Sequence, residues 1–184
     1  MFTTSRLQLR AYCSTDLDNL ILLYNDPLVA IHITEDFVVP RNVNNFGKIL
    51  EMVENSLMFC MVEERVGGAF VGWSAILPMS DAKNRNAAFG LAFLPHFWHK
   101  GYGMEVGTFL VDYAFRCLAM HRVSLSVFEG NDRAIALYKR LGFVEEGRLR
   151  KSVWIDGGWK DNIMMAILED EWVVRSVHRE REES

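Results

Sequence analysis

The stretch WHKGYGMEVG, Trp98–Gly107, lies between an apolar run and a segment with helical periodicity. Gly101 and Gly103 lack a Cβ atom, so the backbone there is able to approach a ligand closely. A strand that runs through such glycines into a helix presents backbone N–H groups at a positive helix terminus. The stretch therefore predicts an anion site, with Lys100 and His99 adding charge or hydrogen-bond donors at its rim.

The spacing of these glycines argues against a dinucleotide-binding fingerprint. That fingerprint is G-x-G-x-x-G, followed by an acidic residue about 20 positions later. Here Gly107 comes one position late, and three runs with antiparallel character precede the turn. On this stretch alone, a glycine-rich turn that binds no ligand remains an alternative interpretation.

The pattern before this stretch predicts strands, two helices and a meander. Leu7 and Leu9 alternate with polar residues, which is typical of a strand with one buried face, and Ser14 is a candidate N-cap. Gly90 suggests a bulge or a close backbone approach in the last meander strand. The expected elements are a strand at 6–12, a helix at 14–26, a mixed connection at 28–42, a helix at 43–55, and strands at 57–64, 69–78 and 86–95.

After the opening stretch we expect a helix at 103–120, a strand at 122–130, a helix at 131–142 and a hairpin at 148–168 around a D-G-G turn. The order of elements indicates an α/β protein built around a mixed sheet. Residues 1–172 are expected to form a single domain. Residues 173–184 alternate in charge without a wide apolar face and are expected to be a charged C-terminal tail.

Composition limits the classes of partner. A chain of 184 residues with a net charge of −4 and a pI near 5.7 lacks the overall positive potential that attracts phosphate backbones. We therefore expect no nucleic-acid partner. A mildly acidic surface tolerates cationic small molecules or basic peptides. The longest uncharged run, 66–80, is too short for a membrane helix of about 20 residues. Three cysteines without C-x-x-C spacing are expected to be reduced and buried, so we predict a soluble, cytoplasmic protein with no membrane partner.

A second motif, NDRAIALYKRLGF at 131–143, carries an amide and a phenol on one helix face. Tyr138 follows Asn131 by seven residues, which is two turns or about 10 Å along the helix. Taken singly, Asn131 is explained as an N-cap and Tyr138 as a core tyrosine. Together they line one groove.

The two motifs together resemble the GNAT superfamily of N-acetyltransferases. WHKGYG stands in the place of that family's Q/R-x-x-G-x-G/A pyrophosphate loop, and NDRAIALYKRLGF in the place of its second cofactor motif. The likeness runs from Arg6 to about Leu168, and the segment 146–168 is most similar to the branch of spermidine and ribosomal-protein N-terminal alanine acetyltransferases. The resemblance implies a mixed, mostly antiparallel, seven-stranded sheet, splayed in the middle and flanked by about four helices.

The resemblance also implies where acetyl-CoA binds. The sheet would splay between the strand at 87–93 and the strand at 122–127, with the cosubstrate wedged into the split. By motif position, the Leu91 N–H would hold the acetyl carbonyl oxygen, Phe93 and Asn131 would contact the pantetheine arm, and Tyr138 would face the sulfur as general acid. The pyrophosphate would lie on the amides of Trp98, His99, Lys100, Gly101, Tyr102 and Gly103.

The proton acceptor is where the sequence departs from the family. An alkyl ammonium has a pKa of about 10.4, so the site must help to remove a proton before the nitrogen attacks. Many relatives carry a strand glutamate where this chain has Ala88, so the base is remote, relayed by water or absent. Glu35 and Asp36 are candidates for binding the cationic acceptor, with Glu35 as a catalytic candidate, although a solvated loop is the simpler explanation for each acid.

Trp154 is a candidate wall of the acceptor cleft, with packing or a homodimer contact as the alternative for a hairpin tryptophan. His96 and His99 lack a carboxylate or thiolate partner, so we expect no metal. The predicted function is an N-acetyltransferase that moves acetyl from acetyl-CoA to a primary amine. The acceptor is a small polyamine, an amino acid or a peptide N-terminus; a catalytically weak acyl-CoA sensor is the alternative.

Overall fold

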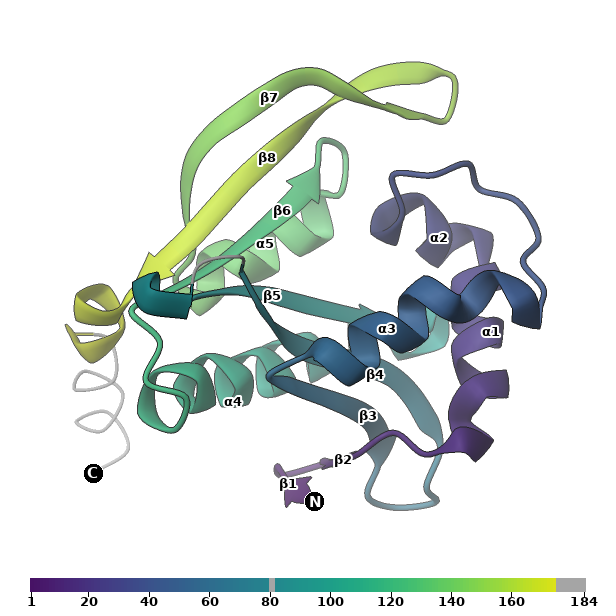
Figure 1. The fold of residues 1–184 in the computed structure, drawn as a ribbon, viewed down its shortest axis with the longest axis horizontal. Coiled ribbons are helices and arrows are strands. Elements are labelled where there is room, and N and C mark those ends of the chain that lie inside the picture. The colour runs from purple at the N-terminus through teal and green to yellow at the C-terminus, as the bar shows by residue number, and fades with distance from the viewer. Residues whose placement is uncertain (80–81, 175–184) are drawn as a thin grey trace.

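In the computed structural model, residues 1–79 and 82–174 are described. Within them, eight strands form one open sheet in the order β1-β2-β3-β4-β5-β6-β8-β7 (Figure 1). The strands are β1 (Phe2–Thr3), β2 (Leu7–Arg10), β3 (Met58–Glu64), β4 (Phe70–Pro78), β5 (Asn86–Phe93), β6 (Arg122–Phe128), β7 (Val144–Ile155) and β8 (Gly158–Leu168). The α-helices are α1 (Leu17–Asn25), α2 (Pro27–Ile33), α3 (Gly47–Asn55), α4 (Tyr102–Arg116) and α5 (Asp132–Leu141).

The sheet is splayed between β5 and β6, the fifth and sixth strands in this order. β5 and β6 are parallel, whereas the other neighbouring strands that the structure describes are antiparallel. The pairing of β5 with β6 covers only Asn86, Ala87 and Ala88 on the β5 side. Beyond Ala88 the strands diverge, while β4 stays paired with β5 as far as Phe93. The expected mixed, mostly antiparallel and splayed sheet is confirmed.

The two faces of β5 carry different side chains, because successive residues of a strand point to opposite faces. Phe89 packs edge-on against Tyr138 of α5, which places the odd-numbered residues of β5 on the α5 face. Ala92 is the cross-strand partner of Trp73, and Trp73 stacks on Tyr24 of α1. Three successive even-numbered residues of β5 on the α1 face are therefore small: Ala88, Gly90 and Ala92.

Two glycines of α4 let this helix pack closely on α5. A Cβ atom on Gly103 would lie 2.9 Å from Leu137 Cδ2, and one on Gly107 would lie 2.5 Å from Leu141 Cδ1. Distances this short require the leucine side chains to move. Gly103 and Gly107 thus serve helix packing, a use that the glycine spacing alone does not reveal.

Three sequence-based expectations are corrected by the structure. The sheet has an eighth strand because Phe2–Thr3 pairs with β2, and two residues are too few to show a period in the sequence. A fifth α-helix, α2, occupies part of the connection expected at 28–42. Gly90 makes no bulge, since the register of β4 with β5 is continuous. Its missing Cβ instead makes room for the Trp73 ring, because a Cβ atom there would lie only 3.2 Å from that ring.

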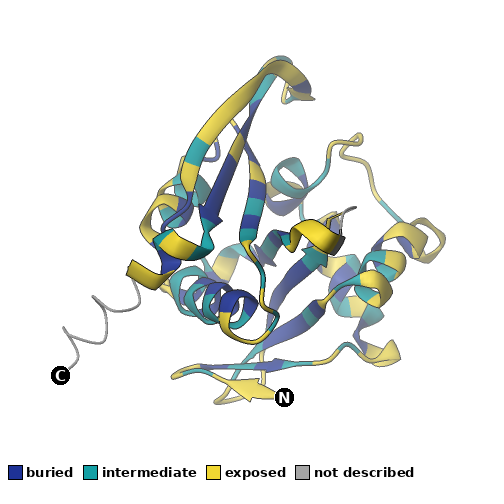
Figure 2. Ribbon diagram, turned by 60° about the vertical axis from the view of Figure 1, so that its left-hand side comes forward, coloured by how far each residue is buried: buried dark blue, intermediate teal, exposed yellow. Residues whose placement is uncertain are grey.

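The buried side chains lie between the sheet and its helices, whereas the β7–β8 hairpin projects from this body with much of its surface exposed (Figure 2). Cys60 is buried as expected, but Cys13 and Cys117 are exposed, because their positions lie outside the packed faces. Val173 and Val174 are exposed and helical, and the rest of the expected tail lies outside the described residues. None of the helices described has the length and apolarity needed to cross a membrane.

Candidate active site

The turn between β5 and α4 presents backbone N–H groups to the cavity. Gly101 is the N-cap of α4 with φ +80°, a conformation that favours glycine, and no side chain caps the helix there. The first helical hydrogen bonds run from Met104 and Glu105 to the Gly101 carbonyl, and the amides of Tyr102 and Gly103 have no acceptor among the described residues. These two amides are oriented as donors for an anion.

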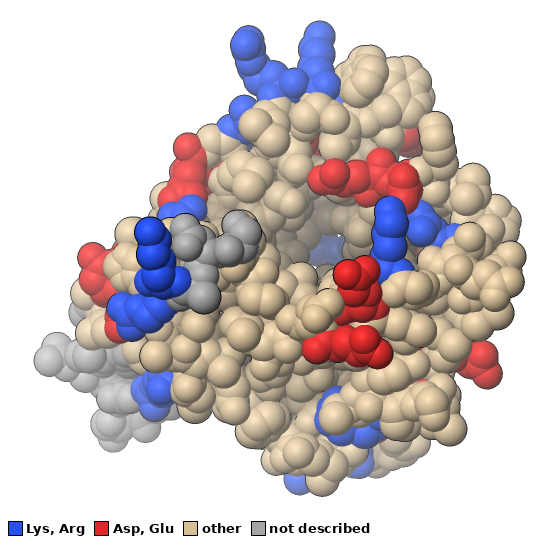
Figure 3. All heavy atoms as spheres, viewed as in Figure 1, with Lys and Arg blue, Asp and Glu red and all other residues tan. Residues whose placement is uncertain are grey.

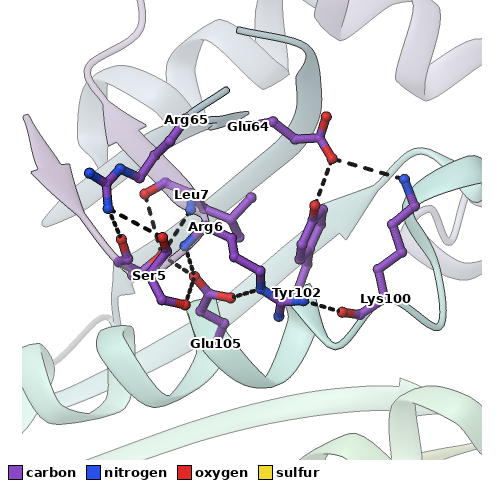
Figure 4. Close-up of polar contacts among 9 residues, drawn as sticks. Ser5, Arg6, Leu7, Glu64, Arg65, Lys100, Tyr102 and Glu105 are labelled. Carbon is purple, nitrogen blue, oxygen red and sulfur yellow. Dashed lines mark hydrogen bonds and ion pairs between the residues drawn. The ribbon is translucent and has the colours of Figure 1, made fainter. Parts of the chain in front are cut away.

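Hydrogen bonds from the N-terminal strand segment hold this turn from behind (Figure 4). Arg6 donates from Nη1 to the Lys100 carbonyl at 2.8 Å and from Nε to Glu105 Oε2 at 2.8 Å. Glu105 also accepts from the Arg6 main-chain N–H and from the Thr4 and Ser5 hydroxyls. Burial raises the pKa of Glu105, but these hydrogen bonds outweigh burial and hold the pKa below its ordinary value.

Lys100 points away from the expected anion site. Its ammonium lies 4.7 Å from the Phe97 ring centroid and 3.9 Å from Glu64 Oε1, and Glu64 also accepts from the Tyr102 hydroxyl (Figure 4). Lys100 is absent from the residues that line the cavity described below. The turn therefore presents backbone donors to the cavity, whereas the Lys100 ammonium lies away from the cavity, beside the Glu64 carboxylate.

Two contacts fix the other wall of the turn. The Trp98 indole N–H donates to the Phe93 carbonyl at 2.7 Å, which ties the turn to the end of β5. The Arg133 guanidinium at the start of α5 lies 3.4 Å from the Trp98 ring centroid, a close cation–π contact. Asn131 caps α5 by accepting from the Ala134 N–H at 3.3 Å. The start of α5 is thus held against the anion turn.

Tyr138 lies in the apolar middle of the site. Its ring packs on Phe89 and Phe143 at centroid distances of 6.0 and 5.9 Å, and the residue is 8% exposed. Burial raises the pKa of Tyr138 to about 12, with a smaller opposing effect from the Arg133 charge. The phenol therefore stays protonated at neutral pH and is able to donate a proton to a leaving group.

One cavity of about 510 Å³ connects these features through the splay. It reaches the anion turn and α5 on one face of the sheet, and α2 on the other, with parts of β5 and β6 between them. Nine residues expected to bind the cofactor line this cavity: Leu91, Phe93, Trp98, His99, Gly101, Tyr102, Gly103, Asn131 and Tyr138. The structure thus brings them together from four separate elements, as the resemblance implies.

The expected acceptor residues lie outside this cavity. Glu35 and Asp36 are exposed in the loop after α2, and neither is among the lining residues. Trp154 is 57% exposed at the hairpin tip, where its ring meets Trp159 edge-on at 5.3 Å. Their roles stay predictions. No group of three or more His, Cys, Asp or Glu side chains is arranged for a metal ion among the described residues.

Among the lining residues that the sequence did not predict, three come from α2, namely Val29, His32 and Ile33. The missed signal is Asp26-Pro27. Asp26 caps α2 by accepting from the Leu28 N–H, and proline is favoured at the first helical position. Burial lowers the pKa of His32, and the Arg133 charge lowers it further.

Acidic side chains gather around a hollow in the face that carries α3, with a few basic groups beside and within it (Figure 3). The segment 26–55, which includes α2 and α3, contains five Asp and Glu residues against two Lys and Arg. Glu51 and Glu54 are exposed on α3, as Glu35 and Asp36 are in the loop before it. The α2 side of the molecule is therefore net negative, which favours a cationic ligand.

The comparisons with known proteins agree with this geometry. Residues 6–144 match the family described as acetyltransferase (GNAT) domain. A spermidine N(1)-acetyltransferase of Vibrio cholerae is 34% identical over 93 residues, a match that spans 50% of this chain and 54% of the relative. The SPbeta prophage-derived N-acetyltransferase YokL of Bacillus subtilis is 28% identical over 137 residues, covering 72% of this chain and 75% of that protein.

Among solved structures, spermidine N-acetyltransferase from Vibrio cholerae in complex with CoA and spermine is similar throughout. The TM-score is 0.81 at 25% identity, covering 92% of this chain and 99% of that chain.

Proposed function

Since the chain belongs to the acetyltransferase (GNAT) family, we propose that it transfers the acetyl group of acetyl-CoA to a primary amine. The observation that carries this proposal is the cavity through the splay, which joins the unpaired amides of the anion turn to Tyr138 and to the acidic α2 side. A diphosphate would accept hydrogen bonds from Tyr102 and Gly103, and the acetyl end would reach the phenol along the unpaired half of β5.

Tyr138 is the general acid in this proposal. Departure of the thiol requires a proton, since its thiolate is a base comparable to a free cysteine of pKa about 8.5. The buried phenol is protonated at neutral pH and lines the same cavity. The Leu91 N–H would stabilise the carbonyl oxygen as it gains negative charge, because a fixed backbone donor needs no reorganisation.

The acceptor is a small cationic amine of the polyamine class. The excess of acids in the segment 26–55 supports this choice, since each added positive charge of the acceptor is attracted to that side. Glu35 and Asp36 would act at the mouth, outside the lined cavity. A relative and a similar structure are named for spermidine and spermine, which points in the same direction.

A thiol-release assay with acetyl-CoA tests the proposal. The protein is mixed with acetyl-CoA and, separately, with spermidine, single amino acids, monoamines and short peptides. We expect thiol release that depends on a polyamine. Release with peptides alone would move the acceptor to a protein N-terminus. Thermal stabilisation by acetyl-CoA with no thiol release from any amine would instead support the sensor function.

The exposed Trp154 and Trp159 pair is proposed as a homodimer contact. Sedimentation of the protein and of its Trp154→Ser variant measures this directly, and a monomeric wild-type protein would contradict it.

A further inference from the structure

We infer that His32 of α2 accepts the proton of the acceptor amine, the role left open by Ala88. This inference rests on the proposed function and names a residue of the same site. His32 lines the cavity from the last turn of α2, on the sheet face opposite to Tyr138. The proton acceptor and the proton donor thus lie on opposite sides of the splay.

The cavity itself narrows the choice of base. Its titratable or charged lining side chains are His32, His99, Tyr102, Arg133, Tyr138 and Arg140, and no carboxylate lines it within the described residues. Arginines stay charged and accept no proton. Tyr138 stays protonated because burial raises its pKa, and Tyr102 donates to Glu64. Two imidazoles remain, and His99 belongs to the anion turn, with φ +61°.

The position of His32 suits an acceptor that enters from the α2 side. The even-numbered residues of β5 from Ala88 to Ala92 are small, and Ala92 lines the cavity together with His32. The neighbouring lining residues Val29 and Ile33 are apolar, as is Ala92 of β5. An ammonium that reaches this part of the cavity loses water, which favours loss of its proton.

The charge state of His32 also fits a base. Burial is the larger cause of its lowered pKa, and Arg133 of α5 is the charged group that acts on it across the cavity. Both effects disfavour the imidazolium, so the ring is neutral at pH 7 and has a lone pair available. The same low pKa makes the protonated ring a ready donor to water afterwards.

The proton balance closes with these two residues. His32 takes one proton from the ammonium and later releases it to water. The amine nitrogen then forms the C–N bond to the acetyl carbon, and the C–S bond breaks as Tyr138 gives its proton to the departing sulfur. The second N–H proton, lost as the amide forms, replaces the one that Tyr138 gave. The products are the N-acetyl amine, the free thiol of CoA and one proton.

The pH dependence of kcat/KM for the amine tests the inference. In the wild-type protein kcat/KM should level off above the His32 pKa, below 6.5, because the enzyme binds the ammonium and removes its proton. In His32→Gln it should be about 100-fold lower at pH 7 and rise about tenfold per pH unit toward the amine pKa of about 10.4. His121→Gln, at an exposed imidazole that is not among the lining residues, is the control, and its profile should keep the wild-type shape.

Two further measurements separate the outcomes. Calorimetric titration with CoA should give His32→Gln the wild-type affinity, which shows that the variant is folded. In His32→Ala, added imidazole should restore part of the lost rate. A wild-type pH profile in His32→Gln, or no rescue of a folded His32→Ala, would overturn the role of His32. Absence of thiol release from the wild-type protein with every amine would instead overturn the proposed function.

Discussion

The two sides of the split sheet are built by different means. On the cofactor side, the anion turn, α4 and α5 are joined by main-chain hydrogen bonds, the partly buried Glu105 carboxylate and close helix packing at Gly103 and Gly107. On the acceptor side, α2 has seven residues and leads into an exposed loop. Many hydrogen bonds and close helix packing therefore hold the cofactor side in place, whereas the acceptor side depends on a few side chains.

This difference separates affinity for the cosubstrate from choice of the acceptor. Backbone amides at a helix start recognise any diphosphate, and their position depends on local geometry that few substitutions preserve. The acceptor side exposes apolar groups such as Phe37, at 82%, and carries exposed acids in a loop, where substitutions are tolerated more easily than in a packed element. Changes on the two sides should therefore move different kinetic constants.

The largest effect is expected for Tyr138→Phe on the cofactor side. Loss of the proton donor should lower kcat by about 100-fold, while the affinity for CoA stays unchanged because the ring remains. Single-turnover kinetics and calorimetry measure the two quantities. Tyr113→Phe is the matched control, since Tyr113 lies on α4 outside the lined cavity. Equal rates in both variants would remove the role of Tyr138.

The Asp16→Asn variant tests how much the ion pair before α1, on the acceptor side, contributes to the stability of the protein. Arg10 donates to both carboxylate oxygens of Asp16 at 2.7 Å, just before α1, and these hydrogen bonds chiefly lower its pKa to about 2. Relative to the unfolded value of 3.8, this shift corresponds to roughly 2 kcal/mol of unfolding free energy.

Because the pKa is depressed in the folded state, this stability is present above about pH 4 and lost as pH falls toward 2. Urea unfolding of wild-type protein and Asp16→Asn should differ at pH 6 and converge toward pH 2. The exposed Asp18→Asn, on the same segment, should change stability by less than about 1 kcal/mol at pH 6. A pH-independent difference for Asp16→Asn would contradict the linkage.

The rigidity of the anion turn is tested by Glu105→Gln. The amide cannot keep the charge-assisted bond from Arg6, which also holds the Lys100 carbonyl. We expect the KM for acetyl-CoA to rise about tenfold with kcat nearly unchanged, since positioning is lost and chemistry is not. Glu145→Gln removes an exposed ion pair on the hairpin and should leave KM unchanged. A fall in kcat alone would indicate a different role for Glu105.

The smallest effect is expected on the acceptor side, for the double variant Glu35→Gln, Asp36→Asn. Both acids are exposed, so their attraction for a cation is screened by salt. The KM for spermidine should rise about threefold at low salt, and the effect should fade at high salt. A monoamine acceptor should respond less than spermidine. An unchanged KM at low salt would exclude these acids from acceptor binding.

The cofactor side was the easier one to predict because its signals are local. Asn131 at the start of α5 and Gly142 at its end are capping residues, and the structure confirms both helix limits. Gly101 adopts the positive φ that its place before α4 requires. The alternation and turn residues of the meander likewise predicted β3, β4 and β5 within two residues at each end.

The acceptor side was predicted less well because long-range contacts decide it. α2 is too short for a clear helical period, and only its Asp26-Pro27 start marks it. On the cofactor side the direction of Lys100 was missed for the same reason, because it depends on Glu64, which is 36 positions away in the sequence. His32 becomes a candidate base only when the cavity places it beside β5.

The sequence by itself determined the family, the order of elements and the two motifs of the cofactor side, because caps, glycine conformations and strand alternation act within a few residues. Only the tertiary structure decided which side chains share the cavity, where the lysine charge points and which glycines serve packing. Those properties depend on distances between segments far apart along the chain, and burial then sets the protonation of Tyr138 and His32.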